Sequence, residues 1–388
     1  MRYRSLLLLL PLTVAHAADD TLAHLVYLND RLELHPHVTA GGRYDSNVDA
    51  ATDAPQDELA VIGGLGLGLL FTWSETTTLA ADAEVEMVVT DRPEQRYRNQ
   101  GTANVLLRRG NAEGSVSAHA AFSRSDDPDQ QTGERLLADN WSGDLNGDLN
   151  GRLHHLSGAL AYRRSDYLDA SREFGADDRD TNTFSVTLGY GLHLDSGDEL
   201  TARTVGDRLL YDQTTTNQDS TSLSGLLGWS RQVSETIGLA IEAGVEYRHY
   251  EANDTLPTVE VISPTWLVSG KTVTATEQTW SLTLSGGIQD AISGNPALQS
   301  RAALSYGQPL TDRWSLTLNG EGYNLRDIES VGGQPMDDRW TVRGVVGTNY
   351  VFRPGLTGEV DAGYEYSDSK LQGAYDRISA HAGMTARF

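Results

Sequence analysis

The sequence predicts an all-β protein: a transmembrane antiparallel β-barrel of the outer-membrane type, with about 18 strands. Three observations carry the prediction. A secretory leader opens the chain, apolar and polar residues alternate with a period of two from about Leu32 to Phe388, and short and long connections follow one another in turn. A period of two places one set of side chains on each face of a strand. We therefore expect one membrane domain at residues 31–388.

The N-terminal stretch MRYRSLLLLLPLTVAHA has the features of a secretory signal. Arg2 and Arg4 give a positive start, an apolar run follows, and Ala15-His16-Ala17 is a small-residue cleavage site. The apolar run is too short to cross a bilayer as a helix. We expect residues 1–17 to be removed, residues 18–30 to form a short periplasmic segment, and the rest to insert into the bacterial outer membrane.

Composition excludes several classes of site. The chain has no cysteine, so disulfides, zinc-thiolate sites and cysteine nucleophiles are impossible. A formal net charge of −24 argues against nucleic acid as a partner. Lysine occurs only at Lys271 and Lys370, so arginine carries nearly all the positive charge. Arginine is suited to bidentate pairing with carboxylates.

The predicted strands are long and two-faced. They run over roughly ten to seventeen residues, whereas strands of soluble sandwiches usually have five or six, and a tilted strand needs about nine to eleven to cross a bilayer. The stretch TFSVTLGYGLHL shows the two sets most clearly. One face carries Phe184, Val186, Leu188, Tyr190, Leu192 and Leu194, and the other carries Thr183, Ser185, Thr187, Gly189, Gly191 and His193.

Turn signals divide the chain into these strands. Tight turns are expected at 74–75, 110–111, 154–155, 195–198, 234–235, 311–312 and 353–355, and longer polar segments at 44–57, 91–98, 125–139, 165–180, 211–220, 327–338 and 367–375. Outer-membrane barrels have short periplasmic turns and longer external loops. The count is 18 strands if residues 258–272, which Pro264 interrupts, form one of them, and 16 without that segment and a neighbour.

Aromatic residues are expected to form a girdle at each membrane interface. Trp73, Trp229, Trp314 and Phe352 lie next to tight turns, in phase with the apolar set, while Trp141 and Trp340 lie at the opposite ends of their strands. The last segment, YDRISAHAGMTARF, ends on Phe388 with Met384 in the apolar phase. This ending resembles the signal that the β-barrel assembly machinery recognises, so that machinery is an expected partner.

The polar set predicts an acidic lumen. We expect charges of one sign along a water-filled passage to attract cations. Asp82, Glu84 and Glu86 share one face of a strand, and we expect them to pair with arginines of neighbouring strands, such as Arg108. The expected lumen-lining acids are Asp82, Glu84, Glu86, Asp144, Asp148, Glu242, Glu246, Glu321, Glu359 and Asp361.

The stretch WSGDLNGDLNGRL fits two structures. Asp144, Asn146 and Asp148 have the spacing that opens a calcium loop, but Leu149 stands where such a loop needs glycine, and no glutamate follows until Glu173. Taken as a strand, the same letters separate into an apolar and a polar set. The sequence therefore favours a strand with its acids toward the lumen and predicts no metal site.

Histidines do not predict an enzyme. The pair His154-His155 is expected in a tight turn, and His35, His37, His119 and His381 on the polar face. Neither G-x-S-x-G nor H-E-x-x-H occurs. We expect no catalytic residues and no cofactor.

The stretch Arg43-Tyr-Asp-Ser-Asn-Val48, in the first predicted strand and its loop, resembles the β-barrel porin-2 group of outer-membrane proteins. The resemblance implies a conduit for exopolysaccharide export, with polysaccharide-export proteins as partners and outer-membrane lipid and lipopolysaccharide around the barrel. A general or small-solute diffusion porin has the same fold and is the main alternative. A closed structural or receptor barrel is a third.

Overall fold

The computed structural model describes residues 31–388 except 54, 93–96, 127–134, 169–179, 213–216, 275, 291–294, 332 and 334. The predicted signal peptide and the periplasmic segment 18–30 lie outside the described residues. Within the described part, no helix has the length and apolar character needed to cross a membrane.

Eighteen strands form one antiparallel sheet. The segment with Pro264 is one of them, so the count of 18 is confirmed. The strands are β1 Leu32–Asp45, β2 Glu58–Ser74, β3 Thr77–Thr90, β4 Tyr97–Asn111, β5 Gly114–Ser125, β6 Ala138–Asn150, β7 His154–Tyr167, β8 Thr181–His193, β9 Asp198–Tyr211, β10 Ser220–Gln232, β11 Ile237–Tyr250, β12 Val259–Val273, β13 Thr279–Asp290, β14 Pro296–Thr311, β15 Trp314–Asp327, β16 Asp338–Arg353, β17 Leu356–Ser369 and β18 Gly373–Arg387.

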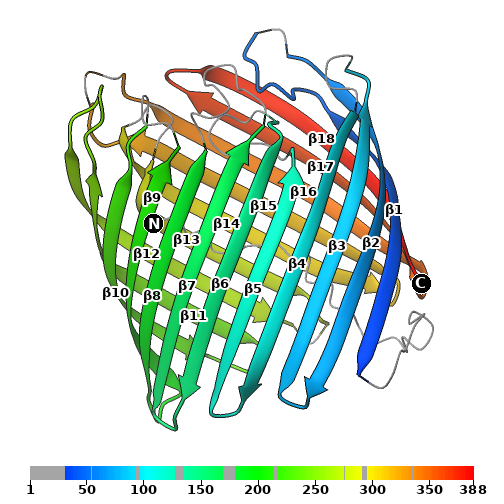
Figure 1. Ribbon diagram of the computed structural model, residues 1–388, viewed down its shortest axis with the longest axis horizontal. Coiled ribbons are helices and arrows are strands. Elements are labelled where there is room, and N and C mark those ends of the chain that lie inside the picture. The colour runs from blue at the N-terminus through cyan, green and yellow to red at the C-terminus, as the bar shows by residue number, and fades with distance from the viewer. Residues whose placement is uncertain are drawn as a thin grey trace.

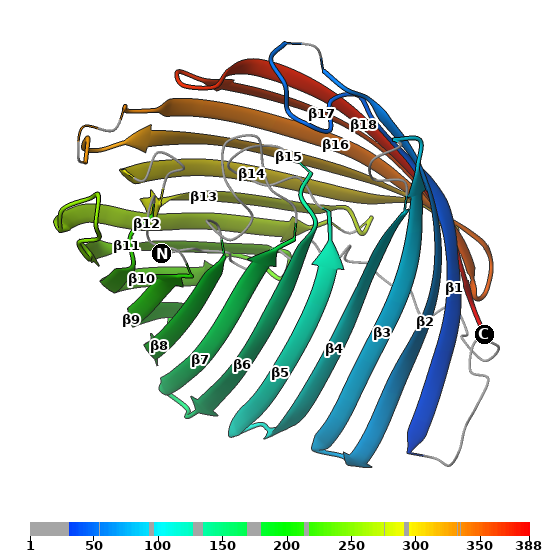
Figure 2. The same cartoon turned by 45° about the horizontal axis from the view of Figure 1, so that its top comes forward.

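Each strand pairs with its neighbours in the sequence, and β1 pairs with β18 to close the barrel (Figure 1). The closing ladder runs from His37 opposite Arg387 to Asp45 opposite Ser379. Beyond it, the N–H of Phe388 donates to the C=O of Pro36 at 2.9 Å. The last residue of the chain therefore takes part in closure. Figure 2 shows the strands of the first half of the chain facing those of the second half across the interior.

The two faces of the wall differ as the alternation predicts. Large apolar side chains are exposed on the outer face, as at Leu188 in β8, which is 62% exposed. The six aromatic residues expected in girdles have the phase of this outer set; Trp73 and Phe352 lie at the turn end, and Trp141 and Trp340 at the loop end. Polar and charged side chains occupy the inner face. The apolar surface is thus outside, the reverse of a soluble barrel.

Most of the predicted connections are found, but one prediction of length and one of position are wrong. Residues 370–372 alone join β17 to β18, so the long segment predicted at 367–375 is wrong: its polar residues extend the two strands instead. The turn between β6 and β7 occupies 151–153, and His154 and His155 begin β7. A tight turn needs only a few residues, and composition alone does not locate its centre.

Candidate functional site: the lumen wall

The inner face of the barrel is the surface that any molecule crossing the interior would meet. All ten acids expected to face the lumen have the inward phase of their strands. They are Asp82, Glu84 and Glu86 on β3, Asp144 and Asp148 on β6, Glu242 and Glu246 on β11, Glu321 on β15, and Glu359 and Asp361 on β17.

Many of these carboxylates have basic partners on adjacent strands. Nδ1 of His119 lies 3.1 Å from Oδ1 of Asp144, and Nε of Arg301 lies 2.6 Å from Oε1 of Glu321. Arg203 of β9 reaches across β10 to pair with Glu242 of β11. These contacts offset part of the negative charge, because opposite charges across adjacent strands attract.

The expected pairing of Arg108 with the carboxylates of β3 is wrong. The β3–β4 register places Arg108 opposite Thr78 and Asp82 opposite Asn104. The alternation fixes which face a side chain occupies, but not how far one strand is shifted along the next. Register depends on the turn, and the strand pattern does not contain it.

The stretch 141–153 forms β6 and the turn that follows. Asp148 Oδ1 lies 3.2 Å from Nε2 of His155 on β7, and Asp144 has His119 on the other side. His154 instead takes the outward phase, where its Nδ1 lies 2.7 Å from the hydroxyl of Tyr190. Within the described residues, no group of three or more His, Asp or Glu side chains is arranged to hold a metal ion.

A buried ionic cluster lies at the loop end of the inner wall. We call it the loop-end cluster: Arg43, Asp45, Glu58, Arg98, Asp126, Arg135 and Arg377. Asp126, in the connection after β5, is only 1% exposed. It accepts hydrogen bonds from Arg43 of β1 at 2.7 and 2.9 Å and from Arg98 of β4 at 2.6 Å. This connection is therefore fastened across the inner ends of β1 to β4.

The charge state of Asp126 follows from these contacts. Burial, the largest influence, would raise the pKa of its carboxyl. The hydrogen bond and charge of Arg43, together with the charges of Arg135 and Arg98, outweigh burial and lower the pKa well below its ordinary value. The carboxylate therefore stays ionised at any pH at which the barrel would work.

The other half of the cluster holds the connection between β1 and β2. Asp45 Oδ2 accepts from Nε of Arg135 at 2.6 Å, and its Oδ1 lies 3.2 Å from Nε of Arg377 on β18. Arg377 also donates to the C=O of Asn47 at 2.7 and 2.9 Å. Arg43, Asp45 and Asn47 belong to the RYDSNV stretch, whose anchoring role the sequence analysis missed. Two charges and an amide at inward positions just before a long loop were the available signal.

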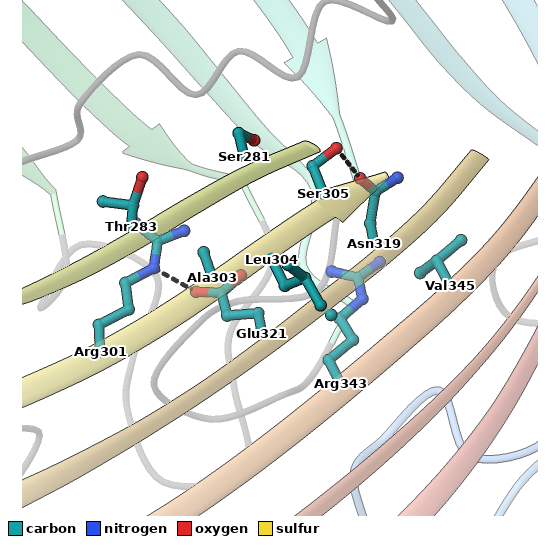
Figure 3. Close-up of a pocket in the computed structure, with 11 residues that line it drawn as sticks. Ser281, Thr283, Arg301, Ala303, Leu304, Ser305, Asn319, Glu321, Arg343 and Val345 are labelled. Carbon is teal, nitrogen blue, oxygen red and sulfur yellow. Dashed lines mark hydrogen bonds and ion pairs between the residues drawn. The ribbon is translucent and has the colours of Figure 1, made fainter. Parts of the chain in front are cut away.

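A pocket of about 240 Å³ is recessed in another part of the wall, on β13 to β16. Its polar lining includes Ser281, Ser305 and Asn319, and the Arg301–Glu321 pair forms one side (Figure 3). Among the described residues, the guanidinium of the exposed Arg343 has no hydrogen bond or ion pair. The pocket thus contains a positively charged guanidinium, surrounded by hydroxyl and amide groups, to which a solute could bind.

Comparisons with known proteins establish the fold. OccAB4 of Acinetobacter baumannii has a TM-score of 0.51 at 12% identity, covering 93% of this chain and 100% of that chain. OpdK of Pseudomonas aeruginosa, crystallised with vanillate, has a TM-score of 0.50 at 11% identity, covering 92% and 99%. The fold is that of the OpdK and OccAB4 barrels.

The sequence itself has no such match. No family model matches it, and no curated protein does. Membership in the β-barrel porin-2 group, which the RYDSNV stretch suggested, is therefore not confirmed. The structural likeness is to OpdK and OccAB4 and concerns the barrel as a whole.

Proposed function

We propose that this protein is an integral outer-membrane channel through which small water-soluble solutes diffuse. The observation that carries the proposal is the reversal of polarity across one closed wall. The apolar outer face, with aromatic residues toward both ends, suits contact with outer-membrane lipid and lipopolysaccharide. The inner face carries ion pairs, hydroxyl groups and the exposed guanidinium of Arg343, all of which can bind hydrated solutes. The β-barrel assembly machinery is the proposed partner for insertion.

A small solute is favoured over the exopolysaccharide that the sequence resemblance implied. OpdK, one of the structural relatives, was crystallised with vanillate, a small aromatic carboxylate. Arginines of the loop-end cluster also bind the backbone C=O groups of Asn47 and Asp126, in two connections. We infer that the two connections narrow the path for a polymer. Inward tyrosines such as Tyr250 and Tyr323 lie on separate strands and make no continuous stacking track for sugar rings.

Planar-bilayer conductance of the purified barrel tests the channel, and swelling of proteoliposomes in neutral solutes of increasing size tests the size limit. We expect steady conductance and a sharp loss of swelling above small oligosaccharides. Deletion of the gene should leave surface polysaccharide at its normal level. Loss of polysaccharide together with a barrel that conducts no ions would contradict the proposal and favour the export role.

One variant links conductance to the loop-end cluster. Asp126→Asn should raise single-channel conductance, because losing the charge weakens the contacts with Arg43 and Arg98 that hold the connection inward. The matched control is Asp139→Asn. Asp139 makes an equally short bridge, 2.6 Å from Arg124, but on the outer face. An equal change in both variants would show that the cluster does not shape the passage.

A further inference from the structure

One ladder of the barrel wall stops early. The β12–β13 pairing ends at Trp266 opposite Gly286, yet β12 continues to Val259 while paired with β11, and β13 continues to Asp290 while paired with β14. Every other ladder in the described wall runs to within one residue of the end of one of its strands. We call this region, in which no ladder joins residues 259–265 of β12 to residues 287–290 of β13, the seam.

The sequence at the base of the seam explains why the ladder stops. Pro264 has no N–H to contribute, and proline is found in sheets at edges and irregularities. The indole of Trp266 lies over Gly286, where a Cβ would collide with it. The hydroxyl of Thr265 donates to the C=O of Gly286 at 3.2 Å. A side-chain hydrogen bond is therefore formed at the point where backbone pairing between β12 and β13 ends.

Above this point the two strands overlap. By alternation Ile288 belongs to the outward set of β13, together with Leu282. It is nevertheless 1% exposed and packs against Tyr250 and Val261, which have the inward phase of β11 and β12. The end of β13 therefore lies on the lumen side of β12. Within the seam, apolar contacts take the place of a β-ladder.

The seam lies at the loop-end girdle. Its outer side carries Ile262, which is 73% exposed and lies opposite the outward Tyr247 of β11. Aromatic rings of this kind mark the boundary between headgroups and hydrocarbon. Ile262 on the outer side is thus next in the chain to Val261 of the Ile288 cluster on the inner side, and no ladder joins β12 to β13 at this level.

We propose that the seam admits a lipid acyl chain from the membrane and gives amphiphiles a side route between lumen and bilayer. The inference rests on the proposed outer-membrane location. Separating the overlapped strands breaks no ladder between β12 and β13, and an acyl chain that fills the space restores the apolar contacts of the Ile288 cluster. Opening the wall between any other neighbours would expose unpaired backbone to hydrocarbon.

Photocrosslinking to lipid tests the proposal. The protein with Ile288→p-benzoylphenylalanine is reconstituted in phosphatidylcholine liposomes and irradiated, and lipid adducts are measured by mass spectrometry. The same substitution at the outward Leu282 is the positive control, and at the inward Thr283 the negative control. We expect adduct at residue 288 severalfold above that at residue 283. Adduct at 282 but only background at 288 would overturn the seam alone; background at 282 would overturn the membrane location as well.

A reversible disulfide across the seam provides a second test. A Cβ on Gly287 would lie 3.8 Å from that of Thr265, the usual separation in a disulfide, and the chain has no other cysteine. The pair Thr265→Cys and Gly287→Cys, added to the residue-288 variant, should reduce its adduct to background when oxidised and restore it when reduced. The pair Ser269→Cys and Thr283→Cys, within the intact ladder, should leave the adduct unchanged. Adduct that persists with the seam disulfide oxidised would contradict the side route.

If the bulky photoreactive side chain prevents assembly, Ile288→Cys carries a nitroxide label instead. Its electron paramagnetic resonance relaxation should respond more to oxygen, which concentrates in the bilayer, than to a water-soluble nickel chelate. The opposite order would place residue 288 in the aqueous lumen and overturn the proposal.

Discussion

Adjacent residues in one strand lie on opposite faces of the barrel wall. Leu188 of β8 is exposed on the outer face, and Thr187 has the inward phase. We expect Leu188→Arg to impair assembly far more than Thr187→Arg, because an arginine facing lipid near mid-bilayer costs about 2–4 kcal/mol and one in the lumen stays hydrated. Assembled, heat-modifiable protein in the outer membrane is the measurement. Equal yields of the two variants would show that the assigned faces are wrong.

The carboxyl group of Asp180, near the loop end of the barrel, is expected to make the stability of the protein depend on pH. Burial, together with repulsion from Asp166 and Asp212, raises the pKa of Asp180 from 3.8 to about 6, against the opposing hydrogen bond from the N–H of Tyr167. Because the folded-state pKa is the higher one, the stability contributed by this group is present below pH 3.8 and is lost as the pH rises through about 6. The charged form is thus unfavourable at neutral pH.

Asp180→Asn should therefore raise stability at pH 8 by about 1 kcal/mol, once solvent screening is allowed for, and leave it unchanged at pH 4. Thermal unfolding in detergent at the two pH values measures this. Asp219→Asn is the control, because Asp219 accepts the same kind of backbone hydrogen bond, from Tyr211 at 2.8 Å, but lies near Arg208. Two results would show that repulsion between carboxylates is not the cause. One is a gain in the stability of Asp180→Asn that is the same at both pH values, and the other is an equal gain in Asp219→Asn.

Single strands were predictable from the sequence because a two-residue period is a local property. The 18-strand prediction counted residues 258–272 as a strand despite Pro264, and β12 spans Val259–Val273. The calcium-like spacing in β6 was correctly interpreted as a strand with inward acids. Positions along the strand were less predictable. His154 was expected in a turn and lies in β7, because turn propensity extends over several residues.

The two interpretations of the β6 sequence, a calcium site and a strand with lumen-facing acids, can be separated by experiment. Asp144→Asn with Asp148→Asn should leave assembly intact, since asparagine is polar and nearly isosteric, while lowering cation preference most clearly in dilute salt, where screening is weak. Reversal potentials across a salt gradient measure the preference. Melting in calcium and in chelator provides the check: a chelator-sensitive parent with unchanged selectivity in the double variant would favour a calcium site.

At the scale of the whole barrel, closure was predictable and the filling of its interior was not. An even strand count and a C-terminal apolar strand anticipate the β1–β18 pairing. The loop-end cluster depends on contacts such as Arg377 with Asn47, 330 residues apart. No local pattern specifies such a partner, because inward arginines and carboxylates occur on many strands. The same holds for the pocket around Arg343, which four strands build together.

The terminal residue should decide whether the barrel assembles. Deleting Phe388, or replacing it with a charged residue, should reduce the folded protein in the outer membrane and leave unfolded chain in the periplasm, because its ring is expected to be part of the assembly signal. Pulse-labelling with cell fractionation follows both pools. Phe388→Tyr keeps an aromatic ring and is the control. Normal membrane levels after deletion would remove Phe388 from the signal.

Closure through the chain ends also sets the order of folding events. The ladder that joins β1 to β18 cannot form until the last strand has been synthesised, and the hydrogen bond from Phe388 to Pro36 requires the final residue. Contacts between distant parts of a chain carry the largest loop-closure entropy and form slowly. Until then the edges of β1 and β18 expose unpaired backbone, which is prone to join with other chains. The interval before closure is therefore the stage at which these two edges are open to pairing with other chains.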